Sequence, residues 1–305
     1  MILGIDTSNY TTSVAIVDRD FNIVCDNRKL LDVKKGNKGL RQSEALFQHI
    51  ENLPKLLDMI NFKGISIDAV AVSSRPRPVE GSYMPCFKAG MTVGRSIADA
   101  LSVPYMEFSH QEGHIAAIKK GSEFENEDNL ICCHLSGGTC EILEVRGKSI
   151  SICGGSRDLS FGQIIDRAGV YFGLDFPAGK DLDKMALAGT ADKAMFRKVK
   201  VEDGYFNISG LENQVYQKDA KTIDICASLF ERITQTLADS VMQVSLKTGI
   251  EKVVFAGGVS SSEYIRSSLP HYLNTLYIFG KPELSSDNAV GTAILGGMRL
   301  WQPKL

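Results

Sequence analysis

The 305-residue chain has no CxxC pair, no long apolar run and no large excess of charge of one sign. Its seven cysteines are an odd number, which argues against a disulfide framework and a cysteine metal site and predicts buried thiols in a reducing compartment. A membrane-spanning helix needs about 20 apolar residues, so none is expected. The formal net charge of -2 gives no overall attraction to nucleic acid, so an RNA substrate would need a local patch or a partner protein.

The start of the chain has no basic segment and no cleavage-like segment, because Met1 leads straight into an apolar strand pattern. We therefore expect a cytoplasmic protein with no membrane partner. With 44% hydrophobic and 23% charged residues, the composition is that of an ordinary globular protein. The length exceeds that of a usual single domain and favours two lobes.

Three apolar strands each end in a tight turn, at Ile5, Leu135 and Ala256. The turns are rich in glycine, serine and threonine, a composition that lets backbone N–H groups approach a phosphate closely. One such turn is also typical of a hairpin. Three of them, two in segments that begin with a β-meander, suggest the duplicated actin/hexokinase type of fold, which binds a nucleotide between its lobes. The expected class is α/β: a two-lobed actin-like ATPase fold with duplicated mixed sheets flanked by helices.

The expected lobes are residues 1–118 and residues 130–288, with a closing helix at 289–305 that packs against the first lobe. The polar, acidic stretch from Lys119 to Asn129 is the expected connection between them.

His110 and His114 are four residues apart, in a segment that Ser109 is expected to cap as a helix. Side chains at this spacing lie on one helical face. Two imidazoles on one face could bind a transition metal together with one further ligand, although such pairs also arise by chance. In zinc proteases a glutamate directly follows the first histidine, whereas Glu112 is two positions on, so a peptidase gets little support.

With these segments, the sequence resembles the TsaD family, the tRNA threonylcarbamoyladenosine transferases once called O-sialoglycoprotein endopeptidases. Matching segments run in one order along nearly the whole chain. They are Ile2–Ser8 (family ILGIETS), Ser109–His114 (HHxEGH), Leu135–Gly138 (VSGGHT), Gly162–Arg167 (GEAFDK), Phe176–Gly179 (YPGG), Ala256–Val259 (AGGV) and Ser286–Asn288 (TDN).

The resemblance implies one divalent iron or zinc ion held by His110, His114 and Asp287, which should then lie close together. It also implies an adenine nucleotide, either ATP, ADP or a carbamoyl-adenylate. The residues implied at the nucleotide are Ser136, Gly137, Gly138, Thr139, Asp166, Gly179, Asp183, Gly257, Gly258 and Ser262. The candidate catalytic residues are Asp6, Ser8 and Asp166. Judged without the resemblance, Asp166 and Asp183 could equally be helix caps or surface carboxylates.

The family reaction transfers the threonylcarbamoyl group of an adenylate, made by another enzyme, to N6 of an adenine in tRNA. The metal would polarise oxygens of the adenylate as a Lewis acid. The implied partners are the adenylate donor, tRNA reached through a partner protein, and either protein partners of the family's kind or a second copy of the chain.

The sequence also departs from the family pattern. The family's Cys-Asp-Glu after ETS is Asn9-Tyr10-Thr11 here, its SGGHT histidine is Thr139, and its nucleotide-binding asparagine is Ser262. Its GPGLVGSL loop is replaced by the segment from Arg75 to Gly81, whose arginines could pair with a carboxylate or phosphate. The implied metal ligands are present, whereas the segments expected near the acceptor and the reacting group differ from the family pattern. This combination indicates a divergent paralogue. Two alternatives to tRNA modification are therefore a carbamoyltransferase with a small-molecule acceptor, and a non-catalytic nucleotide-binding paralogue that scaffolds or regulates an authentic family member.

Overall fold

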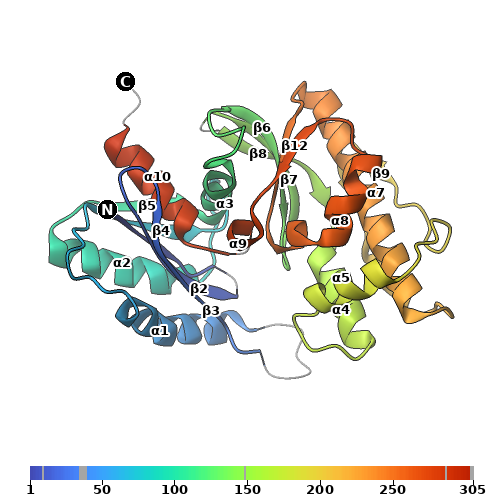
Figure 1. Ribbon diagram of the computed structural model, residues 1–305, viewed down its shortest axis with the longest axis horizontal. Helices are drawn as coiled ribbons and strands as arrows, with labels where there is room; N and C mark the ends of the chain where they lie inside the picture. Colours follow the sequence, from blue (N-terminus) through green and yellow to red (C-terminus); the bar gives the residue numbers. More distant parts are fainter. Residues whose placement is uncertain (9, 34–39, 148, 286, 303–305) are drawn as a thin grey trace. The chain divides into compact units, whose positions relative to one another are not determined.

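The computed structural model describes residues 1–8, 10–33, 40–147, 149–285 and 287–302 (Figure 1). Its contacts divide the chain into two compact units. Of the described residues, unit 1 contains 1–8, 10–33, 40–121, 283–285 and 287–302, and unit 2 contains 122–147 and 149–282. The lobe boundaries expected from the sequence stay a prediction. The expected second lobe, 130–288, included Asp287 and Asn288, whereas the contacts of the structure place these two residues in unit 1. Asp287 therefore belongs to the same unit as His110 and His114.

Unit 1 is built on a five-stranded sheet in the order β3-β2-β1-β4-β5. The strands are β1 (Ile2–Asp6), β2 (Thr11–Val17), β3 (Ile23–Leu30), β4 (Ala69–Arg75) and β5 (Tyr105–Ser109). β1, β2 and β3 form an antiparallel meander, whereas β4 lies parallel to β1 and β5 lies parallel to β4.

Helices cover both faces of this sheet (Figure 1). Because successive strand residues point to opposite faces, Ile2 packs with α10 (Val290–Trp301), whereas Leu3 and Ile5 pack with α1 (Gln42–Asp58) and α2 (Phe87–Leu101). The remaining helices of unit 1 are α3 (His110–Lys119) and the short α9 (Pro282–Ser285), whose first residue the division counts with unit 2. α10 packs against α3 as well as the sheet.

Unit 2 is built on a seven-stranded sheet in the order β12-β11-β6-β7-β8-β10-β9. Its strands are β6 (Asn129–Leu135), β7 (Cys140–Arg146), β8 (Ser149–Ser156), β9 (Val201–Glu202), β10 (Tyr205–Phe206), β11 (Lys252–Ala256) and β12 (Leu276–Phe279). Its helices are α4 (Phe161–Tyr171), α5 (Gly179–Ala188), α6 (Ser209–Val215), α7 (Thr222–Thr248), α8 (Glu263–Ser268) and the 3-10 turns η1 (Gly258–Ser261) and η2 (Leu269–His271). α7 contributes the buried side chains of Phe230, Ile233 and Leu237 to the main core of the unit.

The two sheets repeat one topology. The order β8-β7-β6-β11-β12 reproduces β3-β2-β1-β4-β5, with antiparallel pairing in each meander and parallel pairing beyond it. The duplicated mixed sheets predicted from the sequence are therefore present. Among the described residues, no helix is both long and apolar enough to cross a membrane.

Local hydrogen bonds decide where two elements of the fold begin. The Asp18 carboxylate accepts hydrogen bonds from the backbone N–H groups of Asp20 and Asn22, and β3 starts after this turn, at Ile23. α5 begins at Gly179, so Asp181 lies within its first turn, where the helix dipole favours a carboxylate.

Candidate functional site

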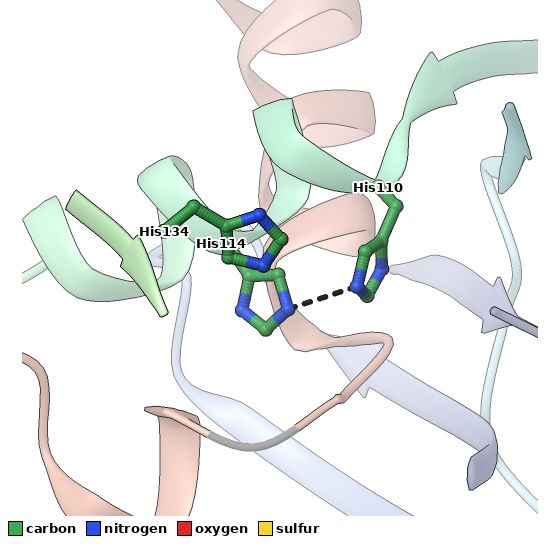
Figure 2. A group of neighbouring side chains, drawn as sticks. All are labelled: His110, His114 and His134. Carbon is green, nitrogen blue, oxygen red and sulfur yellow. Dashed lines mark hydrogen bonds between the residues drawn. The ribbon is translucent and has the colours of Figure 1, made fainter. Parts of the chain in front are cut away.

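The strand–helix junction at Ser109 positions the two histidines. Ser109 is the N-cap of α3: its hydroxyl accepts a hydrogen bond from the Glu112 backbone N–H, and the Glu112 carboxylate accepts one from the Ser109 N–H. This capping box starts the helix at His110 and confirms the sequence-based prediction. His110 and His114 consequently share one face of α3, and their Nε2 atoms are 3.0 Å apart (Figure 2).

Asp287 lies beside both histidines, as expected. Its Oδ1 is 3.4 Å from His110 Nε2 and 3.5 Å from His114 Nε2. Ligand atoms that each lie 2.0–2.1 Å from a tetrahedral ion are about 3.3 Å from one another, and the three distances here are close to that value. Two imidazole nitrogens and one carboxylate oxygen are also a usual donor set for zinc or iron. The three side chains of unit 1 therefore fit such an ion.

Asp6, at the end of β1, is fully buried and contacts the far side of the His110 ring. Its Oδ2 is 3.0 Å from His110 Nδ1 and accepts a hydrogen bond of 2.9 Å from the Ser8 hydroxyl. Because a carboxylate only accepts hydrogen bonds, Nδ1 must carry the proton. A neutral His110 then has its lone pair on Nε2, the atom near Asp287. Ser8 Oγ is itself 3.4 Å from His110 Nε2.

The charges around the histidines favour a cation. Burial lowers the pKa of His110, but the carboxylates of Asp6 and Asp287 outweigh it and raise that pKa to about 10. Burial and the neighbouring His110 lower the pKa of His114. Burial would raise the pKa of Asp287, but its hydrogen bonds to the two imidazoles hold it well below the usual range. With one imidazolium between two carboxylates, the cluster keeps a net negative charge that a metal cation would neutralise.

His134, which Figure 2 also draws, comes from β6 of unit 2. The candidate ligand set consists only of residues from unit 1.

The residues expected at a nucleotide lie in unit 2, starting with the turn after β6. In this turn the Ser136 hydroxyl accepts a hydrogen bond from the Thr139 N–H at 3.0 Å. Gly137 and Gly138 are exposed, and a Cβ at either would meet no atom within 4 Å. The N-cap of α4, Ser160, donates a hydrogen bond of 2.8 Å to the Gly137 carbonyl, so the start of α4 lies against this turn.

The second glycine turn lies beside the first. β6 and β11 are parallel neighbours, with Ala256 opposite His134, so both strands end at the same edge of the sheet. Gly257 has a φ of 88°, and a Cβ there would overlap the Leu135 carbonyl oxygen. Only glycine combines this φ with this close approach. Ligands of open α/β sheets typically bind at such carboxyl edges of parallel strands.

The expected carboxylates of unit 2 are engaged in helix capping. Asp166 Oδ1 accepts a hydrogen bond of 2.9 Å from the Ala178 N–H, next to Gly179 at the start of α5. The two oxygens of Asp183 accept hydrogen bonds from the Ser262 hydroxyl at 2.5 Å and the Glu263 N–H at 2.9 Å, at the start of α8. Burial outweighs the backbone hydrogen bonds and raises the pKa of Asp166. Both carboxylates thus contact the start of a helix, as expected for helix caps. Their roles toward a nucleotide stay predictions.

The candidate residues therefore form two groups, one in each unit. Asp6, Ser8, His110, His114 and Asp287 come together in unit 1, whereas the expected nucleotide residues belong to unit 2. Asn9 and Ser286, which belong to the compared motifs, lie outside the described residues.

Arg75, from the segment that replaces the family's GPGLVGSL loop, ends β4, and its guanidinium is 3.9 Å from the Glu112 carboxylate. The sequence analysis assigned no role to Asn288 or Gly291. The position of Asn288 just before a helix could have predicted that its side chain caps α10.

Comparison with known proteins identifies the family. The family described as "TsaD: tRNA N6-adenosine threonylcarbamoyltransferase" matches residues 30–294. The chain belongs to the TsaD family. A relative named tRNA N6-adenosine threonylcarbamoyltransferase, from Caldicellulosiruptor saccharolyticus, is 28% identical over 319 residues, which cover 98% of this chain and 93% of the relative. The family resemblance drawn from the motifs is therefore confirmed.

Solved structures confirm the fold. The T. kodakarensis HypF structure superposes with a TM-score of 0.66 at 15% identity, over 99% of this chain and 47% of HypF, so this chain spans about half the length of that protein. Component A of the Acidaminococcus fermentans (R)-2-hydroxyglutaryl-CoA dehydratase gives a TM-score of 0.60 at 16% identity and covers 98% of both chains. At such identities the likeness shows the fold alone, which is the actin-like ATPase fold expected from the sequence.

Proposed function

We propose that this TsaD-family protein is a metal-dependent, adenine-nucleotide-binding transferase that moves a threonylcarbamoyl group from threonylcarbamoyl-AMP to N6 of adenosine in tRNA. The activity for which the family and its relatives are named supports the reaction class. The observation that carries the proposal is the cluster of His110 Nε2, His114 Nε2 and Asp287 Oδ1, each within 3.5 Å of the other two.

These three side chains would hold the iron or zinc ion, and their number leaves coordination positions open for oxygens of the adenylate donor. When bound, the ion would supply Lewis acidity that stabilises charge on the donor carbonyl. Asp6 would keep His110 in the tautomer that presents Nε2, a common arrangement around metal-bound histidines. Asp6 acts in this proposal as a positioning residue, because it is fully buried behind the ring.

The two glycine turns of unit 2 would bind the adenine nucleotide. Gly137 and Gly138 are exposed beside the start of α4, where backbone N–H groups and the helix dipole favour a phosphate. Gly258, also exposed, begins the equivalent turn after β11. Asp166, Gly179, Asp183 and Ser262 would support this edge through the two helix caps.

The proposed partners follow from the reaction. They are the adenylate donor, tRNA, and either protein partners that help to bind it or a second copy of the chain. A formal net charge of -2 favours help from a partner protein, since the chain has no overall attraction to RNA. The cytoplasmic location expected from the sequence stays a prediction.

A second candidate is the non-catalytic paralogue, or a carbamoyltransferase with a small-molecule acceptor. The observation that favours it is Thr139, which stands in the turn where the resemblance expects a histidine. Its backbone N–H is held by Ser136 Oγ, so the turn keeps its shape without an imidazole. Such a protein would bind metal and nucleotide but leave tRNA unmodified.

The test compares metal-loaded wild type with His110→Ala and, as a matched control, with His271→Ala, whose histidine is exposed in unit 2. Each protein is incubated with tRNA and threonylcarbamoyl-AMP, and the digested tRNA is analysed for the modified nucleoside by mass spectrometry. We expect product from wild type and His271→Ala, and neither product nor retained metal from His110→Ala. Calorimetry with ATP, ADP and AMP separates the alternatives: nucleotide binding without product would favour the second candidate, and metal retained by His110→Ala would contradict the metal assignment.

A further inference from the structure

Asp287 lies on a short connection between two helices, where its position depends on its flanks. α9 ends at Ser285 and α10 begins at Val290. A metal ligand on such a connection needs support from neighbouring side chains, because small displacements weaken a site that demands a fixed geometry. Whatever fixes this connection also fixes Asp287 Oδ1 at 3.4 Å and 3.5 Å from the two histidines.

The side chain of Asn288, which is almost fully buried, bonds to both flanking helices. Its Nδ2 donates a hydrogen bond of 2.9 Å to the carbonyl of Leu284 in α9. Its Oδ1 accepts hydrogen bonds from the N–H groups of Val290 at 3.1 Å and Gly291 at 3.4 Å, at the start of α10. One amide thus ties the end of α9 to the beginning of α10, with Asp287 on the chain between them.

α10 is in turn fixed against the helix that carries the histidines. A Cβ at Gly291 would overlap the carbonyl oxygen of Gly113, which lies between His110 and His114 on α3. The two helices can pack this closely only because position 291 is glycine. The hydroxyl of Thr292 adds a contact of 3.0 Å to Ser73 in β4. The Ala289 N–H donates to Ser13 in β2 at 2.9 Å, so the start of α10 is tied to the sheet as well.

We propose that Asn288 is a positioning residue for the metal centre: it holds Asp287 in register with His110 and His114 by linking α9 to α10, while the contact between Gly113 and Gly291 sets the separation of α10 from α3. This inference rests on the metal centre proposed above. Asn288 need not contact the ion, and its substitution changes metal binding through the placement of Asp287.

The experiment uses the full chain and two substitutions. Asn288→Ala removes the link to Leu284 and the cap of α10. In Asn288→Ser the hydroxyl can still accept a hydrogen bond at the start of α10, because serine is a good substitute for asparagine there. The shorter serine side chain cannot at the same time reach the Leu284 carbonyl. For each protein, zinc and cobalt affinities are measured by competition with a chelator, the cobalt form is examined by visible absorption, and Tm is measured without metal.

The control is Asp18→Ala, which removes the hydrogen bonds to the Asp20 and Asn22 N–H groups at the opposite end of β1 from Asp6. We expect Asn288→Ala to weaken metal binding about 10- to 100-fold, the usual effect of losing a residue that supports a ligand, with an altered cobalt spectrum. Asn288→Ser should recover Tm more than affinity. Asp18→Ala should lower Tm while its metal affinity and cobalt spectrum stay those of wild type.

Two results would overturn the inference alone: wild-type metal affinity in both Asn288 variants, or an equal loss of affinity in Asp18→Ala, which would make the effect one of general stability. Failure of the wild type itself to bind zinc or cobalt would overturn this inference together with the metal centre. The wild-type measurement therefore distinguishes the two failures.

Discussion

Asp6 Oδ2 and His110 Nδ1 are 3.0 Å apart, although 104 residues separate them in the chain. Asp6 ends the first strand of the unit 1 sheet, and His110 begins the helix that follows its last strand. The parallel strands β1, β4 and β5 end at one edge, which brings the carboxylate behind the ring. This pair decides which imidazole nitrogen faces Asp287.

Asp6→Asn should weaken zinc binding about 10- to 100-fold. The amide of asparagine can donate a hydrogen bond to Nδ1, which would move the imidazole proton to Nε2 and remove the lone pair that faces Asp287. Chelator competition measures the affinity, and Tm of the metal-free protein reports on folding. Asp20→Asn, at an exposed carboxylate of the same unit, is the matched control. Equal affinities in Asp6→Asn and wild type would show that Asp6 does not orient His110.

Gly257→Ala should destabilise the protein by at least about 1–3 kcal/mol, the cost of forcing a residue with a Cβ into a region of positive φ and extended ψ that only glycine readily adopts. The φ of 88° and the overlap of that Cβ with the Leu135 carbonyl both act against alanine. Gly258→Ala is the control, because a Cβ at Gly258 meets no atom within 4 Å. Urea unfolding measures both variants. A Gly257→Ala protein as stable as Gly258→Ala would contradict the tight packing of the two turns.

The cysteines should react slowly with a thiol reagent such as DTNB in the folded protein at pH 8. Six of the seven are buried, and Cys25 is partly exposed. Burial raises the pKa of Cys132 to about 12, and burial also raises the pKa of Cys226 to about 12. Only a small fraction of either thiol is therefore the reactive thiolate at pH 8.

We expect at most one equivalent of rapid reaction from the native protein, assigned to Cys25, and seven equivalents after unfolding in guanidinium. Rapid labelling of several thiols in the native state would mean that the core of unit 2 opens readily.

Asp158 should contribute acid-sensitive stability to unit 2. Burial acts to raise its pKa, but hydrogen bonds from the N–H groups of Ile208, Ser209 and Leu159 outweigh burial and lower the pKa to about 2. The unfolded value is about 3.9. A depressed carboxyl pKa stabilises the fold above the unfolded value, and this contribution is lost as the pH falls from about 4 towards 2.

The Tm of Asp158→Asn should therefore lie below that of wild type at pH 7, with a difference that shrinks between pH 4 and pH 2. Thermal unfolding followed by circular dichroism at a series of pH values measures this. A difference that stayed constant over the whole range would show that the charge of Asp158 contributes nothing.

Much of the candidate site could be predicted because its signals are local in sequence. The spacing of His110 and His114 and the cap at Ser109 involve a few neighbouring residues, and helix geometry alone places them. The glycine turns at Gly137 and Gly257 could be recognised for the same reason. Asp166 and Asp183 show where local reasoning stops: each carboxylate caps a helix other than its own, so its sequence neighbours give no sign of its partner.

The sequence by itself determined the family, the pairing of the two histidines and the strand–turn segments of the duplicated sheets, since these depend on motifs and on short-range backbone geometry. Only the tertiary structure decided that Asp287 belongs to the unit of the histidines, that Asp6 supports His110, and that Asn288 links the helices on either side of Asp287. The physical reason is that these contacts join segments that are far apart in the chain. Strand order and the glycine contact between α3 and α10 set their distances, and neither is encoded in the spacing of neighbouring residues.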